Sequence, residues 1–338
     1  MDCHLLSHGI SIEKESVHDC CLMRGESHGR PYIIDIVNNS VDWEELFLRK
    51  KHLKNSKAEN ECKGCLALKD KDYDDRNYIS YINFNHWNVC NSKCIYCGSE
   101  YNGGDKYFNI LPIIKSLIDK NYFQNDGEIT FQGGEPTILP EFEDLLELFL
   151  KEKARIRVHS SGIKFSEAIH SALSENLITV VISPDCGKSE TYKIIKRVNC
   201  FEKVWENIGK YAEAQKSSDK VKIKYIIIPG VNDDISEVDE WFKKCTESKI
   251  NNIIIEVEGA FASKNEYCVP QACMLIDYMV YKAEKLGLNY EFYDNAFYSV
   301  EKRTESKTSQ NLLQNRELFE KEYNLLREKY KYQNMNYN

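Results

Sequence analysis

From residue 78 onward, short β-rich runs alternate with amphipathic stretches, and this alternation constrains the fold more than any other feature of the chain. Apolar residues recur at three- and four-residue steps in the intervening stretches, as they do along one face of a helix. Such a series predicts parallel strands joined by right-handed helical crossovers, in a complete or partial barrel or an open doubly wound sheet. The β-rich runs are residues 78–84, 127–131, 154–160, 178–183, 222–228 and 252–259, and the helical stretches are residues 107–120, 141–151, 164–174, 201–215 and 235–247.

Composition narrows the functional class. With 338 residues, the chain is long enough to bury a core without disulfides. No apolar run approaches the ~20 residues of a membrane span, and the first residues lack a basic start before an apolar core, so we expect a cytoplasmic protein with no membrane partner. Thiols stay reduced in the cytoplasm, so the presence of 13 cysteines indicates metal binding or catalysis and not disulfides. The net charge of −8 makes general binding to nucleic acid unfavourable, so a small molecule or a peptide is the expected partner.

Three cysteines follow the first strand of the series directly. Cys90, Cys94 and Cys97 form a C-x3-C-x2-C loop, and strand-end loops carry the chemistry of parallel α/β folds. Three thiolates from one loop ligate three irons of a 4Fe-4S cluster and leave the fourth iron open to a substrate or cofactor. Taken alone, the same spacing is also half of a zinc site.

With Tyr96 just before its last cysteine, this loop resembles the signature of the radical S-adenosylmethionine (SAM) superfamily. A second signature of that superfamily, Gly133, Gly134, Glu135 and Pro136, follows the second strand. The resemblance implies a partial (βα)6 parallel barrel over residues 78–265, with a C-terminal helical extension over 266–338. It also implies that the open iron chelates the methionine moiety of SAM and that reductive cleavage produces a 5'-deoxyadenosyl radical.

The resemblance also implies which residues contact the cofactor. The glycines allow close backbone approach, so that the turn binds the methionine ammonium while Glu135 fixes the turn or contacts the amine. At later strand ends, Ser160, Ser161, Ser183 and Asp185, together with the turn of residues 225–233, resemble family contacts to carboxylate, ribose and adenine.

The first 77 residues are irregular and rich in cysteine and histidine, with one short strand over 31–37 and a helix over 42–52. Their cysteine order resembles the SPASM and twitch modules that bind an auxiliary 4Fe-4S cluster, although those modules usually follow the barrel. The implied ligands are Cys3, Cys20, Cys62 and Cys65. Spacing leaves Cys21 open as an alternative to Cys20, and neighbouring histidines leave zinc open as the metal.

Two side chains are candidates for chemistry on the substrate. Cys186, at the end of the fourth strand, is a candidate hydrogen-atom donor, although a buried inert thiol is the commoner case. Glu256, which shares a strand face with Glu258, is a candidate base, with a salt-bridged glutamate as the simpler reading.

The function expected from these features is SAM-dependent hydrogen abstraction from a sugar-like metabolite or a peptide, with oxidation assisted by the auxiliary cluster. The reducing partner would be a flavodoxin or a ferredoxin. Two alternatives remain open: an epimerase that uses a thiol as hydrogen donor, and a metal-stabilised scaffold without catalysis.

Overall fold

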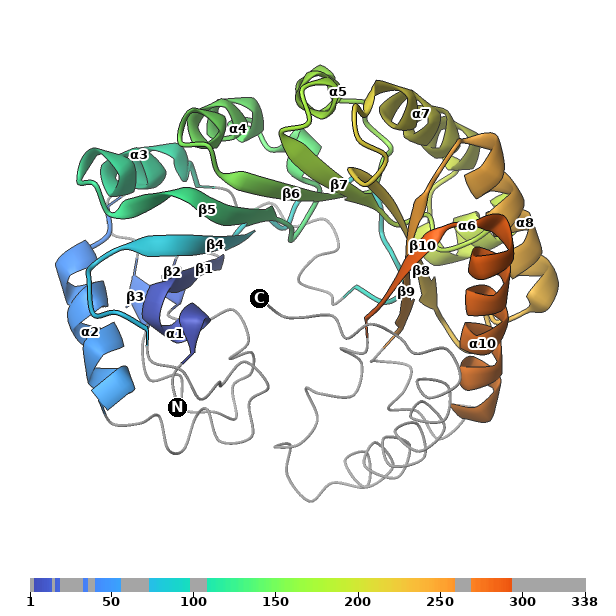
Figure 1. The fold of residues 1–338 in the computed structure, drawn as a ribbon, viewed down its shortest axis with the longest axis horizontal. Helices are drawn as coiled ribbons and strands as arrows, with labels where there is room; N and C mark the ends of the chain where they lie inside the picture. The colour runs from blue at the N-terminus through green and yellow to red at the C-terminus, as the bar shows by residue number, and fades with distance from the viewer. Residues whose placement is uncertain are drawn as a thin grey trace. The chain divides into compact units, whose positions relative to one another are not determined.

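The computed structural model describes residues 3–13, 16–18, 33–35, 40–55, 73–97, 108–258 and 269–293. The chain divides into two compact units, one of residues 1–90 and 103–159, the other of residues 91–102 and 160–338. Both contain parallel strands with helices packed on them, which confirms the expected parallel α/β fold (Figure 1). The domain limits drawn after residues 77 and 265 stay a proposal.

Among its described residues, the first unit contains six strands in the order β6-β5-β4-β1-β2-β3. Its central strands are parallel, β4 to β5 and β5 to β6, and β1 adds to the other edge of β4 in parallel. The N-terminal residues thus extend this sheet, whereas the sequence predicted little core for them. The strands are β1 (Gly9–Glu13), β2 (Ser16–His18), β3 (Ile33–Asp35), β4 (Ile79–Asn85), β5 (Phe123–Phe131) and β6 (Arg155–Ser160).

Aromatic side chains form the core between this sheet and its helices. The rings of Phe84 on β4 and Phe131 on β5 stack with centroids 4.9 Å apart, and Phe149 contacts both. All three are buried, and Phe149 comes from α4, which Figure 1 shows with α3 on one face of these strands. The helices of this unit are α1 (His4–His8), α2 (Trp43–Asn55), α3 (Leu111–Asp119), the 3-10 helix η2 (Pro136–Ile138) and α4 (Phe142–Lys151).

The part of the second unit that the structure describes contains four parallel strands in the order β7-β8-β9-β10. The first three were predicted from their apolar runs. The fourth lies in the stretch expected to be a helical extension, where the structure has α10 (Val269–Leu286) and then a strand. The strands are β7 (Ile178–Ile182), β8 (Val221–Ile227), β9 (Asn252–Val257) and β10 (Asn289–Tyr293).

Two helices of the second unit, α5 and α8, begin at residues whose side chains cap them. Ser166 accepts a hydrogen bond from the backbone N–H of Ile169 and begins α5, and Asp234 does the same for Ser236 at α8. Trp241 of α8 packs edge-on against Tyr225 of β8, with ring centroids 5.2 Å apart. The remaining helices are α5 (Glu167–Ser174), α6 (Ser189–Lys196), α7 (Phe201–Ala214) and α8 (Ile235–Glu247).

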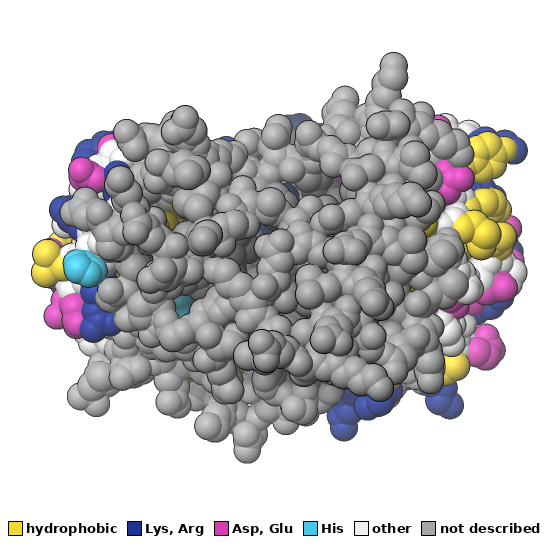
Figure 2. All heavy atoms as spheres, turned by 90° about the horizontal axis from the view of Figure 1, so that it is seen from below, with side chains coloured by type: hydrophobic (Ala, Val, Ile, Leu, Met, Phe, Trp, Pro, Cys, Tyr) yellow, Lys and Arg dark blue, Asp and Glu magenta, His cyan; other side chains and the backbone are white. Residues whose placement is uncertain are grey.

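Side chains of both charges lie on the described surface seen in Figure 2, together with a few hydrophobic ones. Single exposed apolar residues of this kind, such as Leu48 and Ile194, are normal for a folded protein. Within the described residues, no helix combines the length and the apolar character that crossing a bilayer requires.

Candidate functional site

The turn after β5 packs tightly against the backbone that leads to Cys90. Gly133 has a φ of +98°, and a Cβ there would lie 2.6 Å from the carbonyl oxygen of Trp87. A Cβ on Gly134 would overlap the carbonyl oxygen of Val89. Two main-chain hydrogen bonds span this close approach. The backbone N–H of Gly134 donates to the carbonyl oxygen of Trp87 (2.5 Å), and that of Glu135 donates to the carbonyl oxygen of Val89 (2.9 Å). Only glycine permits this approach at both positions.

Glu135 holds the same turn from within. Its carboxylate accepts hydrogen bonds from the backbone N–H (3.2 Å) and the hydroxyl (2.6 Å) of Thr137, and so caps η2, with Pro136 as the first helical residue. The indole of Trp87 donates to the carbonyl oxygen of Glu135 at 3.1 Å. Glu135 is buried. Glu135 was expected to fix the turn or to contact the amine of SAM. These hydrogen bonds correspond to the first role, and the contact with the amine stays a prediction.

Cys94 and Cys97 lie together in the second unit. The backbone N–H of Cys97 donates to the carbonyl oxygen of Cys94 at 3.2 Å. A hydrogen bond with the Cys97 thiol, helped by Lys196 and Ser92, lowers the pKa of Cys94 to about 5 despite its burial. A thiol that ionises this readily suits metal binding, because the thiolate is the form that ligates.

The end of α6 holds the cysteine loop on both sides of Cys94. The backbone N–H of Lys93 donates to the carbonyl oxygen of Lys196 (3.0 Å), and that of Ile95 donates to the carbonyl oxygen of Ile195 (2.9 Å). These carbonyls belong to the last turn of the helix, where intrahelical partners are missing. The loop therefore supplies hydrogen-bond donors for two carbonyl groups at the end of the helix.

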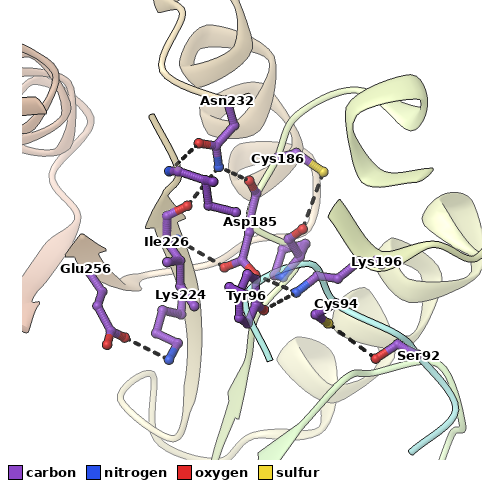
Figure 3. A network of polar contacts seen from close by, with 12 residues as sticks. Ser92, Cys94, Tyr96, Asp185, Cys186, Lys196, Lys224, Ile226, Asn232 and Glu256 are labelled. Atoms are coloured by element: carbon purple, nitrogen blue, oxygen red, sulfur yellow. Dashed lines mark hydrogen bonds and ion pairs between the residues drawn. The ribbon is translucent and has the colours of Figure 1, made fainter. Parts of the chain in front are cut away.

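A buried polar network fixes the side chain that precedes Cys97 (Figure 3). The hydroxyl of Tyr96 donates to a carboxylate oxygen of Asp185 at 2.7 Å, and the ammonium of Lys196 contacts that oxygen at 2.5 Å and the hydroxyl at 2.6 Å. Burial raises the pKa of Tyr96 well above its usual value. Burial lowers the pKa of Lys196, but the charges of Asp185 and Cys94 together outweigh burial and raise that pKa above its usual value.

The other oxygen of Asp185 is also occupied. It accepts the backbone N–H of Ile226 at 3.0 Å. The amide of Asn232, from the turn predicted at residues 225–233, donates to the carbonyl oxygens of Asp185 and Ile226, both at 2.7 Å. Asp185 itself has a φ of +60° and no exposed surface. The network thus joins the ends of β7 and β8 to the cysteine loop.

Glu237 fixes the stretch that follows Asp185. Its carboxylate accepts the backbone N–H groups of Gly187 (2.8 Å) and Lys188 (2.9 Å) and the hydroxyl of Thr191 (2.9 Å). Glu237 is buried at the start of α8. The path of the chain from β7 into α6 therefore depends on one carboxylate.

The predicted serines lie at strand ends. The hydroxyl of Ser161 donates to the side-chain oxygen of Asn91 at 2.9 Å, within the second unit, and thus adds another link to the cysteine loop. The hydroxyl of Ser160 accepts the backbone N–H of Gly162 at 3.0 Å. Ser183, just after β7, is half-buried. Their contacts to a cofactor stay predictions.

Each of the two candidates for substrate chemistry has a bonding partner in this structure. Cys186 is fully buried, its thiol donates to the carbonyl oxygen of Pro184 at 3.3 Å, and burial raises its pKa well above the usual value. Glu256 is paired with Lys224 at 2.9 Å, which matches the simpler reading of this residue. Their roles in substrate chemistry stay predictions.

The predicted auxiliary site falls largely outside the described residues. Cys3 is described and buried, whereas Cys20, Cys62 and Cys65 lie outside the described ranges. No three His, Cys, Asp or Glu side chains converge as a ready metal cage within the part of the chain that the structure describes. The auxiliary ligand set therefore stays a prediction.

Sequence reasoning missed three residues that organise this region: Lys196, Asn232 and Glu237. A lysine in a short amphipathic helix and a glutamate in a first helical turn are ordinarily solvent-exposed, so nothing local marks them. Asn232 did lie in a turn singled out from the sequence, but its bonding to Asp185 depends on a contact between distant residues.

Comparison with known proteins relates this arrangement to a described family. The sequence profile of the Radical SAM superfamily matches residues 84–242. The chain is 27% identical over 190 residues to a GTP 3',8-cyclase from Clostridium botulinum, covering 53% of this chain and 56% of that protein. It is 26% identical over 196 residues to a cysteine-type anaerobic sulfatase-maturating enzyme from Clostridium perfringens, covering 53% and 52%. The chain spans little more than half the length of these relatives.

Among solved structures, the chain resembles SuiB of Streptococcus suis. The complex of SuiB with S-adenosylmethionine superposes with a TM-score of 0.51 at 15% identity, over 81% of this chain and 72% of that chain. The complex of SuiB with the precursor peptide SuiA superposes with a TM-score of 0.51, over 76% of this chain and 64% of that chain. At this identity the likeness concerns the fold alone, and it agrees with the parallel α/β architecture.

Proposed function

Because the chain contains a radical SAM domain, we propose that it binds a 4Fe-4S cluster through Cys90, Cys94 and Cys97 and uses SAM to modify a peptide by hydrogen abstraction. The observation that carries this proposal is the packing of the turn at Gly133 and Gly134 onto the backbone just before Cys90. That packing links the glycine signature to the backbone at the start of the cysteine signature.

Two of the described thiols and the glycine turn have the chemistry that a cluster and SAM require. Two of the three thiols already lie in hydrogen-bonding contact, and the pKa of Cys94 favours a thiolate, since the Cys97 thiol stabilises the charge. The turn at Gly133 offers a backbone surface without side chains, of the kind that a close-lying ligand needs.

When bound, the cluster and SAM supply the chemistry: one electron cleaves a carbon–sulfur bond of SAM to methionine and a 5'-deoxyadenosyl radical, which takes a hydrogen atom from a substrate carbon. The protein's part is positioning. Gly133, Gly134 and Glu135 hold the turn that would orient the methionine end. Tyr96, fixed by Asp185, holds the loop that presents the thiolates.

A peptide is the substrate class we favour over a sugar-like metabolite. Support comes from the relative named for maturing a sulfatase and from SuiB, whose structure was solved with a precursor peptide. The resemblance to a GTP 3',8-cyclase keeps a nucleotide as the competing substrate. A second cluster at Cys3, Cys20, Cys62 and Cys65 would accept the electron that an oxidative modification releases, with a flavodoxin or ferredoxin as the external reductant.

The test is reductive SAM cleavage. The full chain is reconstituted anaerobically with iron and sulfide, reduced with dithionite and given SAM, and 5'-deoxyadenosine is quantified by chromatography. We expect its formation even without substrate. Cys94→Ala should abolish it, whereas Cys200→Ala, a half-buried cysteine outside the motif, should leave it unchanged.

Equal 5'-deoxyadenosine formation by wild type and Cys94→Ala would refute the proposal, as would none from wild type holding a full complement of iron. Substrate class is then separated by adding GTP or a candidate precursor peptide to the active enzyme. Consumption of GTP would refute the peptide assignment and leave the SAM chemistry standing.

A further inference from the structure

The pair of Lys196 and Asp185 is buried to a degree that is unusual for full charges. The lysine side chain is 5% exposed and the aspartate side chain is fully buried, and their charged atoms lie 2.5 Å apart. Replacing such a pair by apolar residues is often neutral or stabilising, so stability alone does not account for it. The ammonium also lies 4.9 Å from the ring centroid of Tyr96.

The position of this ammonium relative to the cysteine loop is fixed by the backbone. Lys196 is the last residue of α6, and its own carbonyl oxygen accepts the N–H of Lys93, next to Cys94. The carbonyl oxygen of Ile195 accepts the backbone N–H of Ile95, on the other side of Cys94. One residue thus holds the loop with its main chain and places a positive charge beside it with its side chain.

We infer that Lys196 is a positioning residue that tunes the cluster proposed at Cys94, holding its loop and raising its reduction potential by the buried ammonium. The inference rests on the proposed function, because it needs a cluster on that loop. Reduction adds one negative charge to the cluster, and a nearby positive charge favours the reduced state most where water is excluded. The negative charge of Asp185 acts in the opposite sense and offsets part of this increase in reduction potential.

Asp185 takes part as a holder of the network. Its two carboxylate oxygens bind Tyr96 and Lys196 on one side and the backbone of Ile226 on the other. A direct contact to SAM, of the kind that the family resemblance implies for these strand ends, would compete with these bonds. The geometry therefore assigns Asp185 to positioning Tyr96 and Lys196.

The test is a redox titration of the reconstituted full chain, followed by EPR. The cluster of this loop is identified as the signal that changes when SAM is added. Four variants are compared with wild type: Lys196→Met, Lys196→Arg, Asp185→Asn and the double variant Lys196→Met/Asp185→Asn. Iron content and circular dichroism are measured for each, so that loss of the cluster or of the fold is seen separately from a change in potential.

We expect Lys196→Met to lower the midpoint potential and Asp185→Asn to raise it, because each leaves one charge unpaired. Lys196→Arg and the double variant should stay close to wild type, since each preserves the net charge. A purely structural role would change cluster occupancy and leave the potential of the remaining clusters unchanged.

Equal midpoint potentials in wild type and the two single-charge variants would overturn the inference while leaving the proposed function intact. If Lys196→Met loses the cluster, the Lys196→Arg variant distinguishes the two explanations. A Lys196→Arg protein that keeps the cluster at the wild-type potential supports the role of the charge. Loss of the cluster in both variants, with the fold intact, overturns the inference. A wild-type protein that takes up no cluster would instead refute the proposed function.

Discussion

The backbone N–H of Glu135 donates a hydrogen bond to the carbonyl oxygen of Val89, 2.9 Å away and one residue before Cys90. This main-chain link connects the turn after β5 to the start of the cysteine loop. It exists because neighbouring Gly134 has no side chain to keep the two backbones apart.

Gly134→Ala should therefore separate the turn from the loop. Its Cβ would overlap the backbone of Val89, so we expect a loss of about 1–3 kcal/mol in unfolding free energy, the usual cost of overpacking. SAM cleavage should fall at least tenfold, on the order of the rate lost when positioning fails. Urea denaturation and the 5'-deoxyadenosine assay measure the two effects.

Gly209→Ala is the matched control. Gly209 lies inside α7, and a Cβ there would meet nothing within 4 Å. Alanine should stabilise the helix by roughly 0.5–1 kcal/mol and leave SAM cleavage unchanged. A Gly134→Ala protein as stable and active as wild type would show that the close approach is dispensable.

Glu237→Ala should loosen the chain between β7 and α6. Three donors lose their shared acceptor, and two of them are backbone groups of Gly187 and Lys188. We expect a loss of roughly 2–4 kcal/mol, since buried groups without a partner each cost about 1–3 kcal/mol. Thermal unfolding measures it. Glu240→Ala on the same helix removes only a surface pair with Lys243 and should cost under about 1 kcal/mol. Equal losses in both variants would contradict this role for Glu237.

The strands and helices between residues 78 and 258 could be predicted well because periodicity is a local property. The run at 127–131 was predicted, but β5 begins earlier, at Phe123, since pairing with β4 extends the strand through polar residues that show no β pattern. The helix α6 was missed, because its only buried apolar side chains are Tyr192 and Ile195, which form too short a helical pattern to stand out. Polar contacts such as that between Lys196 and Asp185 arise only when the chain folds back on itself.

The N-terminal strand illustrates the same limit. The sequence GISIE at residues 9–13 alternates apolar and polar residues, but it is too short to separate from an irregular segment. Its parallel pairing with β4 is fixed by residues about 70 positions away, as in the hydrogen bond from Asn83 to Ser11. The candidate site, by contrast, was located by two short motifs whose chemistry is contained in residue type and spacing.

Cys186 should be unreactive in the folded protein. Its thiol is buried and burial raises its pKa, so little thiolate is available for alkylation. In anaerobic cluster-free protein treated with iodoacetamide, peptide mapping should show Cys200 labelled well before Cys186. Equal labelling rates would mean that Cys186 is accessible and would contradict this prediction.

His86 should make stability depend on pH. Burial lowers its pKa to about 4, and both ring nitrogens lack a hydrogen-bond partner within the described chain. The unfolded chain takes up the proton near the ordinary pKa of 6.5, so folding stability is lost as the pH falls from there toward 4. Linkage gives a loss of about 2 kcal/mol between pH 7 and pH 5.

His86→Phe should remove that loss, and urea denaturation at the two pH values measures it. His170→Gln, on the partly exposed side of α5, serves as the control and should keep the wild-type dependence on pH. A His86→Phe protein that loses stability between pH 7 and pH 5 as steeply as wild type would contradict the assignment.

The central claim is that Cys90, Cys94 and Cys97 leave one iron of a cluster open for SAM. Electron–nuclear double resonance on the reduced, reconstituted protein tests this directly, with SAM labelled by 15N in its amino group and 17O in its carboxylate. The account predicts hyperfine coupling of both labels to the cluster, lost in Cys94→Ala and retained in Cys200→Ala. Absence of coupling in a wild-type protein that holds its iron, or zinc bound at this loop, would contradict it.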